Sequence, residues 1–170
     1  MLPAEVRFDT MDSAGSTNAT SLTYALRRPG SQAEWDAYHM IRRSVMFEEE
    51  DEDDPSEIAS PDLYPLLLLC CDRPVGTIQV DNLNGEDAAF RLVAVDPAEQ
   101  GQGHGRAVLR EAEAFARAIG CRKAVVYATP EAAGFYAAAG YAEDPFDDNY
   151  FGGIVQMTKP LHYAGFSAEE

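Results

Sequence analysis

The chain has 170 residues, 46% of them hydrophobic, which fits one globular domain with an ordinary core. Its net charge of −16 argues against nucleic acid or an anionic membrane as a partner, because proteins that bind such surfaces carry basic patches. No apolar run approaches the roughly 20 residues of a membrane-spanning helix, and the N-terminus lacks a signal-peptide pattern, so we expect a cytoplasmic protein.

The domain boundaries follow from where periodic patterns begin and end. Residues 1–20 are rich in small and polar side chains without periodicity, so we expect a flexible tail there. Residues 21–160 carry successive strand and helix signals without a recognisable linker, and residues 161–170 read as a second tail. We therefore expect a single domain over residues 21–160.

The first predicted elements are a strand over residues 22–26 and a helix after it. Ser31 and Glu34 have the spacing of a capping box, which marks the start of a helix. Apolar side chains then follow at helical intervals, namely Trp35, Tyr38, Ile41 and Val45. The seven consecutive acids from Glu48 to Asp54 predict an exposed loop, because like charges disfavour compact structure.

Three strands joined by tight turns are predicted next. The continuous apolar run Leu66 to Leu69 favours a strand that is covered on both faces. A turn separates it from a second strand over residues 75–80, and the Asn84-Gly85 turn precedes a third strand over residues 88–95.

The last part of the chain alternates helices and strands. An amphipathic helix follows the glycine-rich loop and ends at Gly120, a strand covers residues 123–129, a short helix ends at Gly140, and a final strand covers residues 154–158. The helix between the strands at 88–95 and 123–129 makes these two parallel neighbours. The whole predicts an α/β (α+β) fold with a mixed, mostly antiparallel sheet, one parallel β-α-β crossover, and helices on both faces.

The glycine-rich loop is the strongest functional signal. Gly101, Gly103 and Gly105 stand directly before a helix, where glycines permit positive φ and the helix N-terminus offers free N–H groups to phosphates. A Walker loop is excluded because the chain contains no Gly-Lys pair. A dinucleotide fingerprint is disfavoured because the spacing is GxGxG and no acid follows about 20 residues later.

A different motif fits the loop. The segment from Gln100 to Gly105 has the pattern Q/R-x-x-G-x-G/A and resembles the acetyl-CoA-binding motif of the GNAT acyltransferase superfamily. The segment from Ala132 to Tyr141 is similar to that family's A-x-x-F-Y-x-x-x-G-F/Y pattern, at the proper distance downstream. The resemblance covers about residues 20–160 and implies the GNAT fold.

The resemblance implies acetyl-CoA as cosubstrate and no metal. Backbone N–H groups of the loop would bind the pyrophosphate, and the strand at 88–95 would pair with the pantetheine arm and polarise the thioester carbonyl. This strand and the one at 123–129 would diverge to admit the arm. The expected contacts are Val93, Ala94, Val95, Gln100, Gly101, Gln102, Gly103, His104, Gly105, Arg106 and Phe135. Arg110 and Arg122 are further candidates, beside Arg106, for contacts with the phosphates.

The resemblance also implies two proton transfers, one from the acceptor and one to the leaving thiolate. Tyr136 matches the family tyrosine proposed as the general acid. The strand at 88–95 contains no acid in its "FRLVAV" segment, and Asp81 is the best candidate for the base. His39 and a chain of water molecules are alternatives for the base.

The implied reaction is acetyl transfer from acetyl-CoA to an amine of a small molecule by direct attack. The acidic run Glu48 to Asp54 would attract a cationic acceptor, whereas Arg42 and Arg43 favour an acceptor carboxylate. Two alternatives stay open: a non-catalytic module that binds acyl-CoA, and a regulatory domain that binds NAD or ATP. The sequence is compatible with a homodimer and does not name the acceptor.

Overall fold

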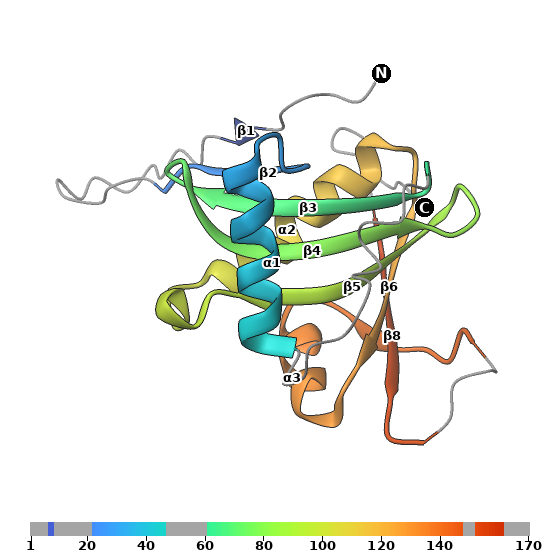
Figure 1. The fold of residues 1–170 in the computed structure, drawn as a ribbon. Coiled ribbons are helices and arrows are strands. Elements are labelled where there is room, and N and C mark those ends of the chain that lie inside the picture. The colour runs from blue at the N-terminus through green and yellow to red at the C-terminus, as the bar shows by residue number, and fades with distance from the viewer. Residues whose placement is uncertain (1–6, 9–21, 47–60, 148–151, 162–170) are drawn as a thin grey trace, which may run out of the picture.

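The structure is a computed structural model, and it describes residues 7–8, 22–46, 61–147 and 152–161. Its strands form one sheet in the order β1-β2-β3-β4-β5-β6-β8-β7, in which only the β5–β6 pair is parallel (Figure 1). The described strands are β1 (Arg7–Phe8), β2 (Tyr24–Arg27), β3 (Leu63–Cys70), β4 (Arg73–Asn82), β5 (Asp87–Val95), β6 (Lys123–Ala128), β7 (Ala142–Glu143) and β8 (Val155–Pro160). The helices are α1 (Gln32–Met46), the 3-10 turn η2 (Pro97–Glu99), α2 (His104–Ala118) and α3 (Pro130–Ala138). The predicted mixed sheet with one parallel crossover is confirmed.

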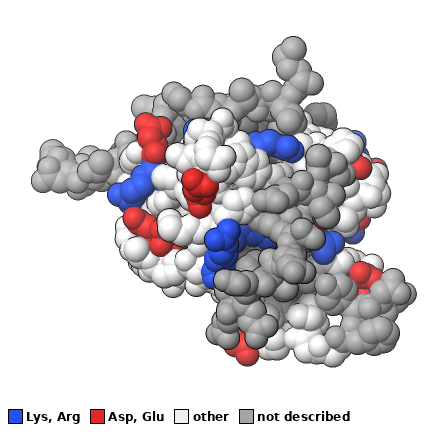
Figure 2. Space-filling model, viewed as in Figure 1, with Lys and Arg blue, Asp and Glu red and all other residues white. Residues whose placement is uncertain are grey.

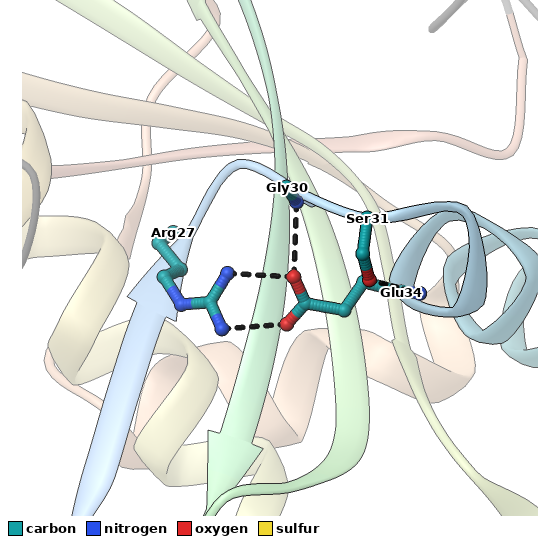
Figure 3. A network of polar contacts seen from close by, with 4 residues as sticks. All are labelled: Arg27, Gly30, Ser31 and Glu34. Carbon is teal, nitrogen blue, oxygen red and sulfur yellow. Dashed lines mark hydrogen bonds and ion pairs between the residues drawn. The ribbon is translucent and has the colours of Figure 1, made fainter.

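Helix α1 begins at the predicted capping residue. The Ser31 hydroxyl accepts a hydrogen bond from the Glu34 backbone N–H at 3.2 Å. The Glu34 carboxylate accepts from the Gly30 N–H at 3.0 Å, and two bonds of 2.8 and 2.5 Å join it to the Arg27 guanidinium (Figure 3). Arg27 thus holds the end of β2 against the first turn of α1, and the pKa of the Glu34 carboxyl is lowered, mainly by its hydrogen bond to Arg27.

Helices α2 and α3 also end where the sequence predicted. Gly120 follows α2 with φ +95, and Gly140 follows α3 with φ +99, the left-handed conformation that favours glycine at a helix C-terminus. The Thr129 side chain accepts from the Ala132 N–H at 3.3 Å and caps α3, whose first residue is Pro130.

The core has two layers, one on each face of the sheet. The larger cluster joins α2 and α3 to the sheet and includes Leu66 and Leu68 of β3. The smaller cluster joins α1 to the other face and includes Leu67 and Leu69. Adjacent residues of β3 therefore point to opposite layers, as the continuous leucine run predicted, and each buried leucine stabilises the fold by about 1.5–3 kcal/mol.

Two short segments at the ends of the described structure have defined contacts. Arg7–Phe8 form a strand on the outer edge of β2, whose backbone groups would otherwise lack partners on that side. Leu161 is buried, and its N–H donates to the Arg122 carbonyl at 2.7 Å, so ordered packing extends one residue past the expected boundary. The acidic run lies outside the described residues, and no described helix is long and apolar enough to cross a membrane.

Candidate functional site

The parallel strands β5 and β6 separate partway along their length. They pair from Asp87 with Lys123 to Phe90 with Val126, and no further pair follows although both strands continue. Beyond Phe90, β5 stays paired with β4 on its other side, where Val95 lies opposite Gly76. The β6-facing backbone edge of residues 91–95 therefore has no strand partner in the described part of the chain, as a strand-like ligand arm requires.

A β-bulge marks the point of separation. Gln79 lies opposite Arg91 and Thr77 lies opposite Ala94, so two residues of β5, Leu92 and Val93, face a single residue of β4. Leu92 has φ +56, a conformation that costs a non-glycine residue about 1–2 kcal/mol. Such a bulge bends the strand and re-aims the backbone groups that follow it. No glycine or other residue pattern in this part of the sequence predicted the bulge.

The loop between β5 and α2 presents an open backbone. The Asp96 side chain accepts from the Ala98 N–H at 3.0 Å, and the Gln100 amide donates to the Val95 carbonyl at 3.2 Å, which closes the loop onto β5. Gly101 and Gly103 have φ +81 and +86, and a Cβ added at either would meet no heavy atom within 4 Å. No side chain of the described residues caps the N-terminus of α2, so among these residues its first N–H groups are available for an anion. This open loop is compatible with the pyrophosphate contact that the family resemblance implies.

The His104 side chain turns away from this open backbone. Its ring is 2% exposed, and its Nδ1 lies 2.9 Å from the Tyr24 hydroxyl of β2. Its Nε2 lies 3.6 Å from the Glu99 carboxylate, which also accepts from Arg73 at 2.9 Å. His104 can therefore offer only its backbone to a phosphate, while its ring fixes α2 against β2.

Phe135 and Tyr136 lie on α3 beside the loop. A Cβ at Gly105 would stand 3.4 Å from the Phe135 ring, so glycine allows the loop and α3 to approach closely. The Tyr136 ring packs edge-on against Phe135 and Tyr141, and its hydroxyl has no hydrogen bond to any described residue. Burial raises the pKa of Tyr136, so the phenol is protonated at neutral pH and can donate a proton.

Asp81 lies on the opposite face of the sheet from Tyr136. Val80 belongs to the cluster under α2 and α3, so its neighbour Asp81 points to the α1 face. Asp81 Oδ1 accepts from the Gln79 amide at 2.9 Å, and Oδ2 pairs with the Arg91 Nε at 2.7 Å. The structure thus separates the two predicted proton-transfer residues by the sheet, one on each side of the point where β5 and β6 part.

The other sequence candidates lie on helix α1. The His39 ring stacks on Trp35 with 5.8 Å between centroids, and His39 and Arg43 line a hollow of about 540 Å³ along α1. Arg42 is 1% exposed and lies over the Tyr38 ring. The contact with the Tyr38 ring stabilises the position of Arg42 on α1, and a contact of Arg42 with an acceptor carboxylate stays a prediction.

Basic side chains gather between α2 and α3. They surround a groove of about 350 Å³ and comprise Arg106, Arg110, Arg117 and Lys159. Lys159 is engaged by Glu113 at 2.5 Å, while Arg106 and Arg110 are exposed. Arg122 is exposed but does not line the groove. On the face that carries α1, by contrast, acidic and basic side chains are interspersed (Figure 2).

Comparisons with known proteins agree with this geometry. Residues 29–141 match the sequence model described as the acetyltransferase (GNAT) family. Glucosamine 6-phosphate N-acetyltransferase 1 of Oryza sativa subsp. japonica is 45% identical over 51 residues, which are 30% of this chain and 31% of that relative. The match thus spans about a third of the length of that relative.

Two solved structures show the same fold. The ribosomal-protein-S18-alanine N-acetyltransferase of Escherichia coli superposes with a TM-score of 0.66 at 18% identity, covering 84% of this chain and 96% of that one. An aminoglycoside 6′-N-acetyltransferase complexed with coenzyme A gives 0.65 at 12% identity, covering 79% and 94%.

Proposed function

This chain belongs to the acetyltransferase (GNAT) family, and we propose that it transfers an acetyl group from acetyl-CoA to an amine of a small molecule. The observation that carries the proposal is the parting of β5 and β6 after Phe90 and Val126, directly beside an open glycine loop at a helix N-terminus. One end of this arrangement suits a diphosphate, and the other suits an amide-containing arm.

Each part of the cosubstrate has a counterpart in the chain. The backbone N–H groups of residues 100–106 bind the pyrophosphate, and the β6-facing backbone of Val93, Ala94 and Val95 binds the pantetheine amides. The Phe135 ring of α3 packs against Gly105 beside the loop. The bulge at Leu92 changes the direction of the backbone groups that follow it. A backbone N–H of this unpaired strand edge would stabilise the negative charge of the tetrahedral intermediate.

The proposed reaction needs two proton transfers. The amine nitrogen attacks the carbonyl carbon, the new C–N bond forms, and the C–S bond breaks. Asp81, directly or through water, takes the proton that the amine loses, using lone pairs that its hydrogen bond with Gln79 and its ion pair with Arg91 leave free. Tyr136 gives its phenolic proton to the leaving thiolate. The two groups approach the reacting centre from opposite faces of the sheet.

A panel of amines tests this proposal. Purified protein is mixed with acetyl-CoA and each amine, and free CoA thiol is followed over time. Amine-dependent thiol release supports the transferase. Saturable binding of CoA with no amine-dependent release across the panel would instead support a non-catalytic acyl-CoA-binding module, an alternative that the absence of an acid among residues 90–95 keeps open.

A further inference from the structure

Arg91 stands at the boundary between the paired and the separated parts of β5. Phe90 is the last residue of β5 that pairs with β6, and Arg91 is the next. Phe90 belongs to the cluster under α2 and α3, so Arg91 points to the α1 face together with Asp81. If the proposed function holds, this is the face from which the acceptor approaches.

The Arg91 side chain is held in place from two sides. Its Nε pairs with Asp81 at 2.7 Å, and Asp81 is itself fixed by Gln79. Its guanidinium lies over the Tyr127 ring of β6, 5.1 Å from the centroid, and the Tyr127 hydroxyl donates to Asp147 at 3.0 Å. The arginine therefore spans the two separating strands in a fixed orientation.

The terminal nitrogens of the Arg91 guanidinium have no partner among the described residues. The Arg91 side chain is 34% exposed, and its two terminal nitrogens make no hydrogen bond or ion pair with any described residue. A guanidinium whose Nε is paired with a carboxylate keeps its charge and still offers two parallel N–H donors, which match a carboxylate or a phosphate. Such a site selects by geometry as well as by charge.

We propose that Arg91 determines acceptor specificity by binding an anionic group, a carboxylate or a phosphate, on the amine acceptor. The inference rests on the proposed function and narrows its substrate class to amines that also carry an anion. The acidic groups nearby, Asp81 and Asp147, are each engaged by a partner, Arg91 and Tyr127. In the described structure neither carboxylate forms a hydrogen bond or ion pair with the terminal nitrogens of Arg91, which therefore offer N–H donors on the α1 face.

Matched acceptor pairs test the proposal. An amino acid is compared with its amide, and an amino sugar with its phosphate ester, in wild type and in Arg91→Gln. We expect wild type to favour the anionic member by about tenfold or more in kcat/KM, and Arg91→Gln to bring the ratio close to one with an unchanged KM for acetyl-CoA. Inorganic phosphate should inhibit wild type in competition with the anionic acceptor, and inhibit Arg91→Gln weakly.

Two further variants provide a second test of the guanidinium and a control. Arg91→Lys preserves the charge and loses the two-donor fork, so the KM of the anionic acceptor should rise while that of its neutral partner stays constant. Arg91→Lys tests the proposal by itself if Arg91→Gln does not fold. Arg28→Gln is the matched control, since Arg28 is an exposed arginine whose Nη2 donates to the Leu63 carbonyl away from this site.

The outcomes separate this inference from the proposed function. A wild-type preference for neutral or cationic members, or a preference that survives in Arg91→Gln, would overturn the inference and leave the acetyltransferase intact. Failure of wild type to acetylate any amine of the panel would overturn the proposed function and the inference together.

Discussion

The Tyr24 hydroxyl and the His104 Nδ1 lie 2.9 Å apart and join strand β2 to the first residue of α2. Both side chains are buried, and the His104 backbone belongs to the loop that we propose for pyrophosphate binding. A contact 80 residues apart in sequence thus fixes the position of the loop.

Tyr24→Phe removes this contact and leaves the ring in place. A neutral hydrogen bond of this kind contributes about 0.5–1.5 kcal/mol, so we expect the KM for acetyl-CoA to rise by about two- to tenfold while kcat changes little. Steady-state kinetics with a saturating acceptor measure both constants. A fall in kcat at constant KM would contradict a role confined to the loop.

Gly103→Ala should weaken acetyl-CoA binding through the backbone. Gly103 has φ +86, which costs a residue with a Cβ about 1–2 kcal/mol, and relief of that strain would move the N–H groups of the loop. Calorimetric titration with CoA should show a loss of affinity of about tenfold or more.

Gly134→Ala is the control for this measurement. Gly134 lies within α3, and an added Cβ there meets no heavy atom within 4 Å, so alanine should stabilise the helix by about 0.5–1 kcal/mol. Unchanged CoA affinity in Gly103→Ala, with Gly134→Ala also unchanged, would show that the loop backbone is not the binding surface.

Glu111→Gln should stabilise the protein at neutral and alkaline pH. The Glu111 carboxyl is 2% exposed, its Oε2 has no hydrogen-bond partner among the described residues, and burial raises its pKa above the ordinary value, partly opposed by Arg110. The folded state therefore holds this proton more tightly than the unfolded state, and stability falls as pH rises from the unfolded pKa through the folded one.

Thermal unfolding of wild type and Glu111→Gln at several pH values measures this effect. The glutamine variant should gain about 1 kcal/mol at pH 8 and little near pH 4, where the wild-type carboxyl is mostly protonated in both states. A gain that is equal at both pH values would contradict the assigned cause.

Tyr136→Phe should slow CoA release without weakening CoA binding. The variant keeps the ring that packs against Phe135 and Tyr141 and loses only the phenolic proton. General acid catalysis contributes about 10²-fold or more where proton transfer limits the rate. Because the pKa of Tyr136 is raised, wild-type activity should show no loss of this acid near neutral pH. Equal rates in the two forms would remove Tyr136 from the acid role.

The sequence predicted the features that depend on local patterns. The glycine spacing, the Thr129-Pro130 start of α3 and the left-handed glycines after α2 and α3 are each specified within a few residues, and the structure confirms them. The parallel β5–β6 pair followed from the helix between these strands.

The sequence did not predict the features that depend on contacts between distant strands. The bulge at Leu92 arises from the pairing of β5 with β4, and no residue type at that position requires it. The ion pair of Arg91 with Asp81 depends on which face each strand presents after the bulge, so the sequence did not predict that Arg91 lies beside Asp81. Strand β7 has two residues and carries no periodicity to detect.

Transfer of a labelled acetyl group tests the central claim most directly. The protein is incubated with acetyl-CoA that carries deuterium in the acetyl group and with an amine that carries an anionic group. Mass spectrometry then measures the acetylated amine, and a thiol assay measures free CoA. We predict deuterated amide and free thiol in equal amounts. Thiol released at the same rate without the amine, or CoA bound with no acetylated product from any amine, would contradict it.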